Sequence, residues 1–209
     1  MKENNWFDPF YIQSHLNEEE SNIQKNVRDF CNNELKPTVV ERNRKNEFDK
    51  ELYPKFGSLG VLGQTVKTHG GSGTSNLAYG LVAYEFEKID SSYRSSISVQ
   101  SSLVIHPINE FGSQEQKDKY LPPLIKGEKI GCFGLTESEA GSDPTSMKTS
   151  FKKTKDGYII NGSKNWITNA PIADIFIIWA IEENKDHKSI KGFIIEKNTK
   201  GLNLSLIHI

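Results

Sequence analysis

The chain has 209 residues, of which 25% are charged and 35% are hydrophobic, and its formal net charge at pH 7 is −1. This composition is ordinary for a globular protein, and the lack of a basic excess excludes a protein that binds nucleic acid or an anionic membrane surface through charge. The longest apolar run, residues 175–181, is too short to cross a bilayer, so no membrane span is expected.

The first part of the chain is predicted to be helical. Asn17 is a good N-cap with Glu20 at the capping-box position. The apolar residues that follow recur at helical spacing, namely Ile23, Val27, Phe30, Cys31 and Leu35. Pro37 suits the first turn of a second helix, and Asp49 begins a third. The glycine-rich run over residues 69–75 is predicted to be a loop.

Two further helices are predicted before the pattern changes to that of strands. Residues 77–89 carry two adjoining stripes at helical spacing, one of them largely apolar. Ser113 begins another helix, with Gln116 at the capping-box position. Pro122 and Pro123 are expected to shorten that helix, because proline lacks the N–H donor.

The pattern changes to that of strands from Ile130 onward. Asp156-Gly157 and Asn161-Gly162 are dipeptides typical of hairpin turns. The predicted strands cover residues 130–135, 158–160, 166–168, 174–181, 192–196 and 202–207. Helices followed by strands predict an α+β fold, with an α-helical domain over residues 1–129 and an incomplete antiparallel β-barrel or sandwich domain over 130–209.

The cysteines and histidines show no metal-binding pattern. Cys31 and Cys132 lack CxxC spacing, and the 5 histidines are scattered. We therefore expect no metal site and two buried thiols in a reducing compartment. The first residues contain neither an apolar signal core nor an Arg-rich transit pattern. These features predict a cytoplasmic bacterial protein, with a mitochondrial-matrix protein whose presequence has been removed as the alternative.

Two segments in the second half carry the strongest functional signal. Residues 132–144 read CFGLTESEAGSDP, and residues 161–169 read NGSKNWITN. Placed after a helical half, they resemble the flavin-binding β-domain of the acyl-CoA dehydrogenases, and the resemblance extends over about residues 7–201. It implies FAD as the cofactor. Ser138 stands where the family usually has proline, which is expected to loosen the turn without removing a flavin donor.

The resemblance implies a flavin site built from both segments. A flavin needs an apolar or aromatic wall for its ring, and donors for its polar edge and its pyrophosphate. Ser142 is expected to lie between cofactor and substrate. The alternative interpretation, if each feature is considered alone, is that Gly141-Ser142 is an ordinary turn and that Trp166 is an ordinary core aromatic. The residues expected to bind the cofactor are Phe133, Leu135, Thr136, Gly141, Ser142, Trp166, Ile167 and Thr168.

A third segment, residues 92–103, reads SYRSSISVQSSL and narrows the resemblance to the glutaryl-CoA dehydrogenases. A dicarboxylic acyl chain places a carboxylate in the pocket, and an arginine fork is the suitable partner for it. The residues expected to bind the substrate are Arg94, Ser95, Ser98, Val99 and Ser142, with Glu87 orienting Arg94. The alternative is that Arg94 is an ordinary surface arginine after a serine-rich helix start.

The resemblance also implies a reaction and partners. A glutamate removes the α-proton of the acyl thioester while hydride passes to the flavin, and glutaryl-CoA then loses CO2 to give crotonyl-CoA. An electron-transfer flavoprotein is the expected electron acceptor, and the complete protein is expected to be a homotetramer. Other possibilities are a dehydrogenase for another short-chain acyl-CoA or a non-catalytic remnant with the same fold.

No catalytic residue is assigned within the chain. The family carries its catalytic base on a C-terminal helical domain, which is expected beyond residue 209. Glu137, Glu139 and Glu196 are candidates by residue type only. We therefore expect the chain by itself to be inactive.

Overall fold

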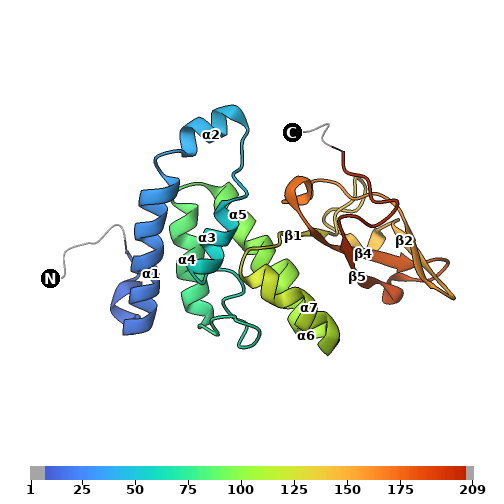
Figure 1. Cartoon of the computed structure of the whole chain (residues 1–209), viewed down its shortest axis with the longest axis horizontal. Helices are drawn as coiled ribbons and strands as arrows, with labels where there is room; N and C mark the ends of the chain where they lie inside the picture. The colour runs from blue at the N-terminus through green and yellow to red at the C-terminus, as the bar shows by residue number, and fades with distance from the viewer. Residues whose placement is uncertain (1–7, 206–209) are drawn as a thin grey trace.

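The computed structural model describes residues 8–205, in which a helical half precedes a sheet half. Figure 1 shows the two halves side by side. Two π-helical segments, η2 Cys31–Leu35 and η3 Val99–Ile105, continue α1 and α5 without a break. Because η3 runs directly into α6, the elements α5, η3 and α6 form one continuous helical rod from Ser91 to Phe111. The helices are α1 Glu18–Phe30, α2 Val39–Lys45, α3 Leu52–Ser58, α4 Asn76–Glu87, α5 Ser91–Ser98, α6 His106–Phe111 and α7 Gln114–Ile125.

The helix starts read from the sequence are confirmed at α1 and α7. The Asn17 side chain accepts a hydrogen bond from the Glu20 N–H at 2.8 Å, and the Glu20 carboxylate accepts one from the Asn17 N–H at 3.2 Å. Ser113 and Gln116 make the same reciprocal pair at α7. Both helices therefore satisfy free N–H groups of their first turns with a capping box.

The prolines of α7 behave differently from the prediction. The helix continues through Pro122 and Pro123 and ends at Ile125. Leu121, Leu124 and Ile125 are buried in the helical core. Packing of these side chains therefore holds the last turn, although the two prolines remove donors from it.

The second half is a mixed sheet, so the expected β domain after the helical domain is confirmed but its strands are not all antiparallel. β4 pairs with β1 and β2 in parallel and with β5 antiparallel, while β2 and β3 form an antiparallel hairpin. Parallel pairing arises because β1 and β4 are joined by a long crossover that contains the hairpin. The strands are β1 Gly131–Gly134, β2 Ser150–Thr154, β3 Gly157–Asn161, β4 Ile175–Glu182 and β5 Lys191–Glu196.

Two strand predictions are wrong in the described part of the chain. Residues 166–168 form a loop, because Trp166 has φ 58° and the N–H of Asn165 bonds to the chain beyond β1. Residues 202–205 have no regular structure, and 206–207 lie outside the described residues. The hairpin at Asp156-Gly157 is confirmed, whereas the chain leaves β3 after Asn161 without forming a second hairpin.

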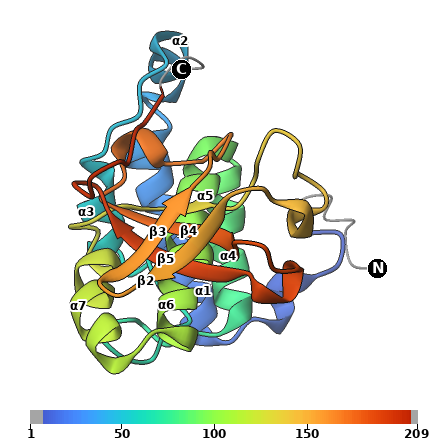
Figure 2. The ribbon, with the colours of Figure 1, turned by 90° about the vertical axis from the view of Figure 1, so that its right-hand side faces the viewer.

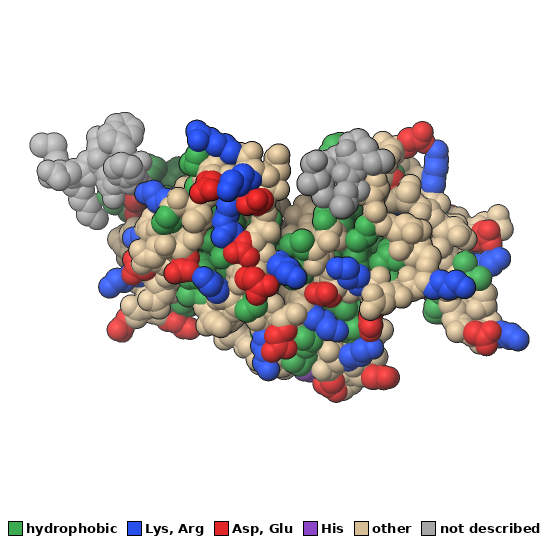
Figure 3. Space-filling model, turned by 45° about the horizontal axis from the view of Figure 1, so that its top comes forward, with side chains coloured by type: hydrophobic (Ala, Val, Ile, Leu, Met, Phe, Trp, Pro, Cys, Tyr) green, Lys and Arg blue, Asp and Glu red, His purple; other side chains and the backbone are tan. Residues whose placement is uncertain are grey.

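The sheet lies against the helical half, as the turned view in Figure 2 shows. Acidic and basic side chains are interspersed over the face shown in Figure 3, in keeping with the near-zero net charge. Among residues 8–205, none of the helices is both long enough and apolar enough to cross a membrane.

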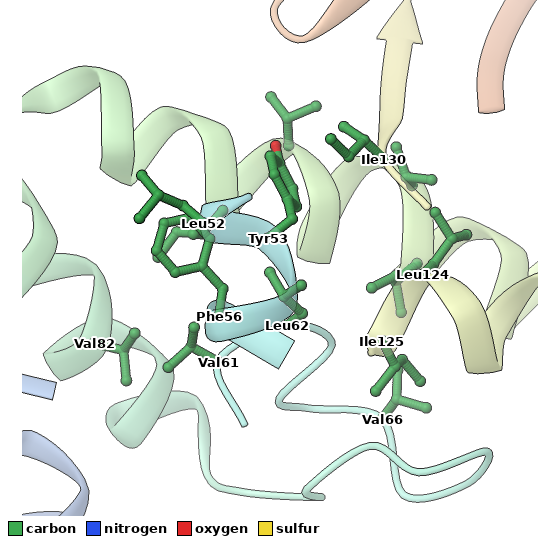
Figure 4. Close-up of a cluster of buried hydrophobic side chains, with 14 of the residues drawn as sticks. Leu52, Tyr53, Phe56, Val61, Leu62, Val66, Val82, Leu124, Ile125 and Ile130 are labelled. Atoms are coloured by element: carbon green, nitrogen blue, oxygen red, sulfur yellow. The ribbon is translucent and has the colours of Figure 1, made fainter. Parts of the chain in front are cut away.

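The main core is formed by the helices and by one face of the sheet. Tyr53 and Phe56 of α3 are fully buried in its centre, and Figure 4 shows them beside Leu62 and Leu124. Ile177 of β4 belongs to the same cluster. A smaller cluster on the other sheet face contains Cys132, Ala173 and Phe176. The two domains therefore share a continuous apolar core.

Gln100 in η3 joins the two halves through polar contacts. Its side chain is fully buried, and its amide nitrogen donates to the Leu124 and Lys129 carbonyls at 2.9 Å each. Its amide oxygen accepts from the Gly131 N–H at 2.7 Å. A Cβ at Gly131 would lie 2.5 Å from Val104 Cγ1, so only glycine allows β1 to approach the rod this closely.

Candidate functional site

The candidate substrate-binding residues begin at an ion pair between α4 and α5. The Nε of Arg94 donates to one Glu87 carboxylate oxygen at 2.6 Å, and the Ser91 hydroxyl donates to the other at 2.5 Å. The hydrogen bond from Arg94 is the main cause that lowers the pKa of Glu87. Arg94 remains 39% exposed, and its terminal nitrogens have no hydrogen-bond partner within residues 8–205. One edge of the guanidinium is therefore fixed, and the other edge is available.

The serines that follow Arg94 also present available hydroxyls. Ser95 and Ser98 are half buried, and their hydroxyls form no hydrogen bond in the described part of the chain. Val99 is only 9% exposed and belongs to the helical core. Little of its side chain is therefore available to a ligand.

The first candidate cofactor segment begins on β1 and continues past its end. Phe133 is half buried, and its ring meets the Trp179 ring edge-on with the centroids 6.0 Å apart. Leu135 and Thr136 follow the strand and are half buried. The hydroxyl and the backbone N–H of Thr136 have no hydrogen-bond partner among the described residues, so both are available to a ligand.

The turn after Thr136 is closed by its backbone. Glu137 and Ala140 exchange two hydrogen bonds, at 3.1 Å and 3.2 Å. Ser138, which replaces the proline usual in the family, lies exposed in this closed turn. Gly141 and Ser142 follow and are exposed, and a Cβ at Gly141 would meet no protein atom within 4 Å. The space beside this part of the turn is therefore open.

The second candidate cofactor segment is a loop held against the first. Trp166 is 73% exposed, Thr168 is exposed, and Ile167 packs on the smaller core cluster. The Asn165 N–H donates to the Thr136 carbonyl at 2.9 Å. This bond holds the start of the loop that carries Trp166 and Thr168 against the chain just beyond β1.

Asn169 connects this loop to α5. Its side-chain nitrogen donates to the Gly131 carbonyl at 3.2 Å. Its side-chain oxygen accepts from the Ser96 hydroxyl at 3.3 Å, and that hydroxyl also lies 2.6 Å from the hydroxyl of Tyr53. The loop that carries the candidate cofactor residues and the helix that carries Arg94 are thus held together by a buried polar chain.

A buried ion pair lies under the turn. Lys164 and Glu137 are 8% and 9% exposed, and their charged atoms are 2.8 Å apart. Glu137 also accepts hydrogen bonds from the N–H groups of Lys148 and Thr149, at 2.7 Å and 3.0 Å. Burial acts to raise the pKa of Glu137, but the hydrogen bonds from Lys164 and from these N–H groups outweigh it and hold the pKa at about 2.

We expect the ionised Glu137 to make the free energy of unfolding decrease as the pH is lowered. Its pKa is about 2 in the folded state against an ordinary 4.5, so its contribution is present above about pH 4.5 and is lost as the pH falls toward 2. Glu137→Gln should therefore lower the free energy of unfolding most at pH 6, and the difference should shrink with acid. Urea unfolding measured from pH 6 to pH 2.5 checks this, with the exposed Glu139→Gln as control. A difference that is constant with pH would contradict it.

None of the three glutamates considered as bases is free within the described residues. Glu137 is buried and paired. Glu139 is paired with Lys148, and Glu196 accepts from Lys119 at 2.8 Å and from Tyr120 at 3.0 Å. None of these three glutamates is therefore available as a base, and no group of three or more metal-ligating side chains occurs among the described residues.

The chemistry of this surface fits a flavin. It offers an exposed indole as a wall for the ring, an open turn at Gly141, and the unpaired hydroxyls of Thr136, Ser142 and Thr168 as donors and acceptors.

Sequence reasoning assigned no role at this site to Lys164, Asn169 and Gln100. The first two stand inside the NGSKNWITN segment, so the motif contained the signal although no role was read from it. Gln100 shows no signal in the sequence, because its importance depends on three backbone groups that only the fold brings to it.

Comparison with protein families gives two matches. The profile of the acyl-CoA dehydrogenase N-terminal domain matches residues 17–128, and that of the acyl-CoA dehydrogenase middle domain matches residues 132–208. A short-chain-specific acyl-CoA dehydrogenase from Clostridium acetobutylicum is 40% identical over 194 residues, covering 92% of this chain and 51% of that protein. A mitochondrial isovaleryl-CoA dehydrogenase from Pongo abelii is 38% identical over 196 residues, covering 91% and 46%.

Solved structures resemble the chain over the same extent. A glutaryl-CoA dehydrogenase from Mycobacterium smegmatis in complex with FADH2 superposes with a TM-score of 0.88 at 40% identity, covering 92% of this chain and 49% of that one. A structure of the electron transferring flavoprotein of Acidaminococcus fermentans gives a TM-score of 0.83 at 37% identity, covering 89% and 50%. The chain thus spans about half the length of the relatives it matches.

Proposed function

This chain belongs to the acyl-CoA dehydrogenase family, and from that premise we propose that it binds FAD and contributes the acyl-binding surface of a dehydrogenase whose preferred substrate is glutaryl-CoA. The observation that carries the substrate proposal is Arg94, whose guanidinium is fixed by Glu87 on one edge and available on the other. Ser95 and Ser98 flank it with available hydroxyls. A dicarboxylic acyl group uses such a cation, because a carboxylate at the end of its tail needs a partner there.

In this proposal, FAD would supply the oxidising chemistry as the hydride acceptor for the β-carbon of the acyl thioester, and loss of CO2 from the oxidised glutaryl-CoA would give crotonyl-CoA. The residues of the chain bind and orient. Trp166 provides a wall for the ring, Thr136 and Thr168 donate to its polar edge, and Ser142 lies between the ring and the substrate. Arg94 holds the distal carboxylate and so fixes how far the acyl chain enters. None of Glu137, Glu139 and Glu196 is assigned as the base that removes the α-proton, because each of them is paired or buried.

Another short-chain acyl-CoA is the second candidate substrate. The Arg94–Glu87 pair supports it, because a guanidinium that already has a carboxylate partner does not require a second one. The relatives from Clostridium and Pongo, named for short-chain and isovaleryl substrates, point the same way. Comparing a dicarboxylic with a monocarboxylic thioester decides between the two.

We further propose an electron-transfer flavoprotein as the acceptor, a homotetramer as the complete assembly, and a bacterial cytoplasm or a mitochondrial matrix as the location. The proposed acceptor is supported by the similar structure from Acidaminococcus fermentans, which is named for an electron transferring flavoprotein. Bacterial and mitochondrial relatives support both compartments.

Flavin binding by the purified chain tests the cofactor proposal. We expect titration with FAD to saturate at one flavin per chain, with quenching of flavin fluorescence. Trp166→Ala should weaken binding about tenfold, because loss of a ring-stacking contact costs about 1.5 kcal/mol. Phe111→Ala serves as the control, since that ring is exposed on α6 and belongs to neither candidate segment.

A chain that takes up no flavin would contradict the cofactor proposal and favour a non-catalytic protein with this fold. Equal flavin affinity of Trp166→Ala and the unmodified chain would leave FAD as the ligand but remove the indole from its site.

A further inference from the structure

We propose that Lys164 and Glu137 are a positioning pair that sets the geometry of the turn that holds the flavin, an inference that rests on the function proposed above. The two side chains do not face the open surface, since both are about nine-tenths buried beneath it. Their role is to orient the groups that would touch the cofactor, chiefly those of Thr136.

Lys164 is directed at the end of β1. Its Nζ donates to the Leu135 carbonyl at 2.9 Å and to a Glu137 carboxylate oxygen at 2.8 Å. Its aliphatic stem crosses Gly134, where an added Cβ would lie 3.4 Å from Lys164 Cγ and 2.5 Å from Ile178 Cδ1. The absence of a side chain at Gly134 therefore allows the ammonium group to reach the peptide just before the flavin-binding residues.

Glu137 connects the same point to β2. Its carboxylate accepts from Lys164 and from the backbone N–H groups of Lys148 and Thr149, which directly precede that strand. A single carboxylate therefore ties together three segments that are distant in sequence. Its own backbone closes the turn with Ala140, so a shift of this carboxylate would shift the whole turn.

Lys164, the basic member of the pair, also helps to fix the orientation of the Thr136 backbone. Two successive carbonyls, those of Leu135 and Thr136, accept hydrogen bonds from Lys164 and from the Asn165 N–H. With both carbonyls held by the 164–165 segment, the peptide between them has one orientation. The charged donor on the Leu135 carbonyl polarises that peptide and strengthens the Thr136 N–H as a donor. That N–H and the Thr136 hydroxyl are the groups without a partner in the described structure.

Substitution of Lys164 tests the proposal through the flavin itself. In Lys164→Met, the stem remains but the ammonium is lost, and we expect FAD affinity to fall at least tenfold. The visible circular dichroism of the bound flavin should change even at saturating FAD, because the donors at Thr136 are displaced. Lys148→Met is the matched control, since Lys148 forms an exposed ion pair with Glu139 on the same turn. It should leave affinity and spectrum within twofold of the unmodified chain.

The outcomes separate this inference from the cofactor proposal. A flavin spectrum of Lys164→Met at saturation that superimposes on that of the unmodified chain would overturn the positioning role, because mere destabilisation is reversed by excess ligand. If Lys164→Met does not fold, Glu137→Gln replaces it and should show the same change of spectrum, and an unchanged spectrum counts against the pair. No flavin uptake by the unmodified chain overturns the cofactor proposal and, with it, the positioning role.

Discussion

Substitution of Gln100 by alanine is expected to lower the free energy of unfolding by about 4 kcal/mol, since each buried backbone group left without a partner costs about 1–3 kcal/mol. Two such groups lose their partner at once, namely the Lys129 carbonyl and the Gly131 N–H, while the Leu124 carbonyl keeps its hydrogen bond from the Gly127 N–H. The side chain is fully buried, so an alanine also leaves a cavity, and water has little access to replace the amide. Urea unfolding monitored by circular dichroism and by tryptophan fluorescence measures this cost.

Gln114→Ala is the matched control for that experiment. Gln114 is exposed at the start of α7, and its amide reaches only the Asp118 carboxylate. Its removal should change the free energy of unfolding by less than about 0.5 kcal/mol. A cost below about 1 kcal/mol for Gln100→Ala would mean that the rod and β1 are held by the apolar core alone and that the polar bridge is dispensable.

Substitution of Arg94 by alanine is expected to weaken glutaryl-CoA binding to the flavin-loaded chain about 100-fold, because loss of one partner from a desolvated charge pair costs about 3 kcal/mol. Butyryl-CoA has no distal carboxylate, so its affinity should change less than about threefold. Isothermal titration with both thioesters gives the two ratios. Arg94→Lys keeps the charge but loses the planar fork, and it should recover only part of the affinity for glutaryl-CoA.

Arg42→Ala is the control that shows the effect of losing an ion-paired arginine outside the candidate residues. Arg42 forms an ion pair with Asp49 at 3.0 Å, and neither residue is among the candidate substrate-binding or cofactor-binding residues, so its removal should leave both thioester affinities unchanged. Equal losses of affinity for glutaryl-CoA and butyryl-CoA in Arg94→Ala would show that Arg94 supports the fold of the site but does not recognise the distal carboxylate. The second candidate, another short-chain acyl-CoA, would then be the favoured substrate.

The fold class and the starts of α1 and α7 were predictable because their signals are local. Asn17 and Glu20 lie one turn apart, and their capping box requires nothing from the rest of the chain. The order of a helical half and a strand-patterned half is equally visible in the sequence. The loop at residues 166–168 was missed because its aromatic and β-branched residues have high strand propensity, while the partners that prevent a strand lie near Thr136.

The candidate site was only half predictable for a similar reason. By resemblance, the motif named residues that are expected to face a ligand, such as Thr136 and Trp166, and these stay predictions. It did not show that Lys164 and Glu137 would be buried beneath them, since a charged side chain in a polar segment is normally expected at the surface. Burial of this pair depends on the approach of β1, β2 and the 162–169 loop, and that approach is a property of the whole sheet.

The parallel pairing of β1 with β4 has a consequence for synthesis. During translation, the ribosome releases Gly131–Gly134 long before Ile175–Ile178, the partners that pair with them. Until that later stretch emerges, the nascent chain has a half-built sheet. A pause of the ribosome before Ile175 would therefore leave an intermediate in which β1 has an unpaired strand edge.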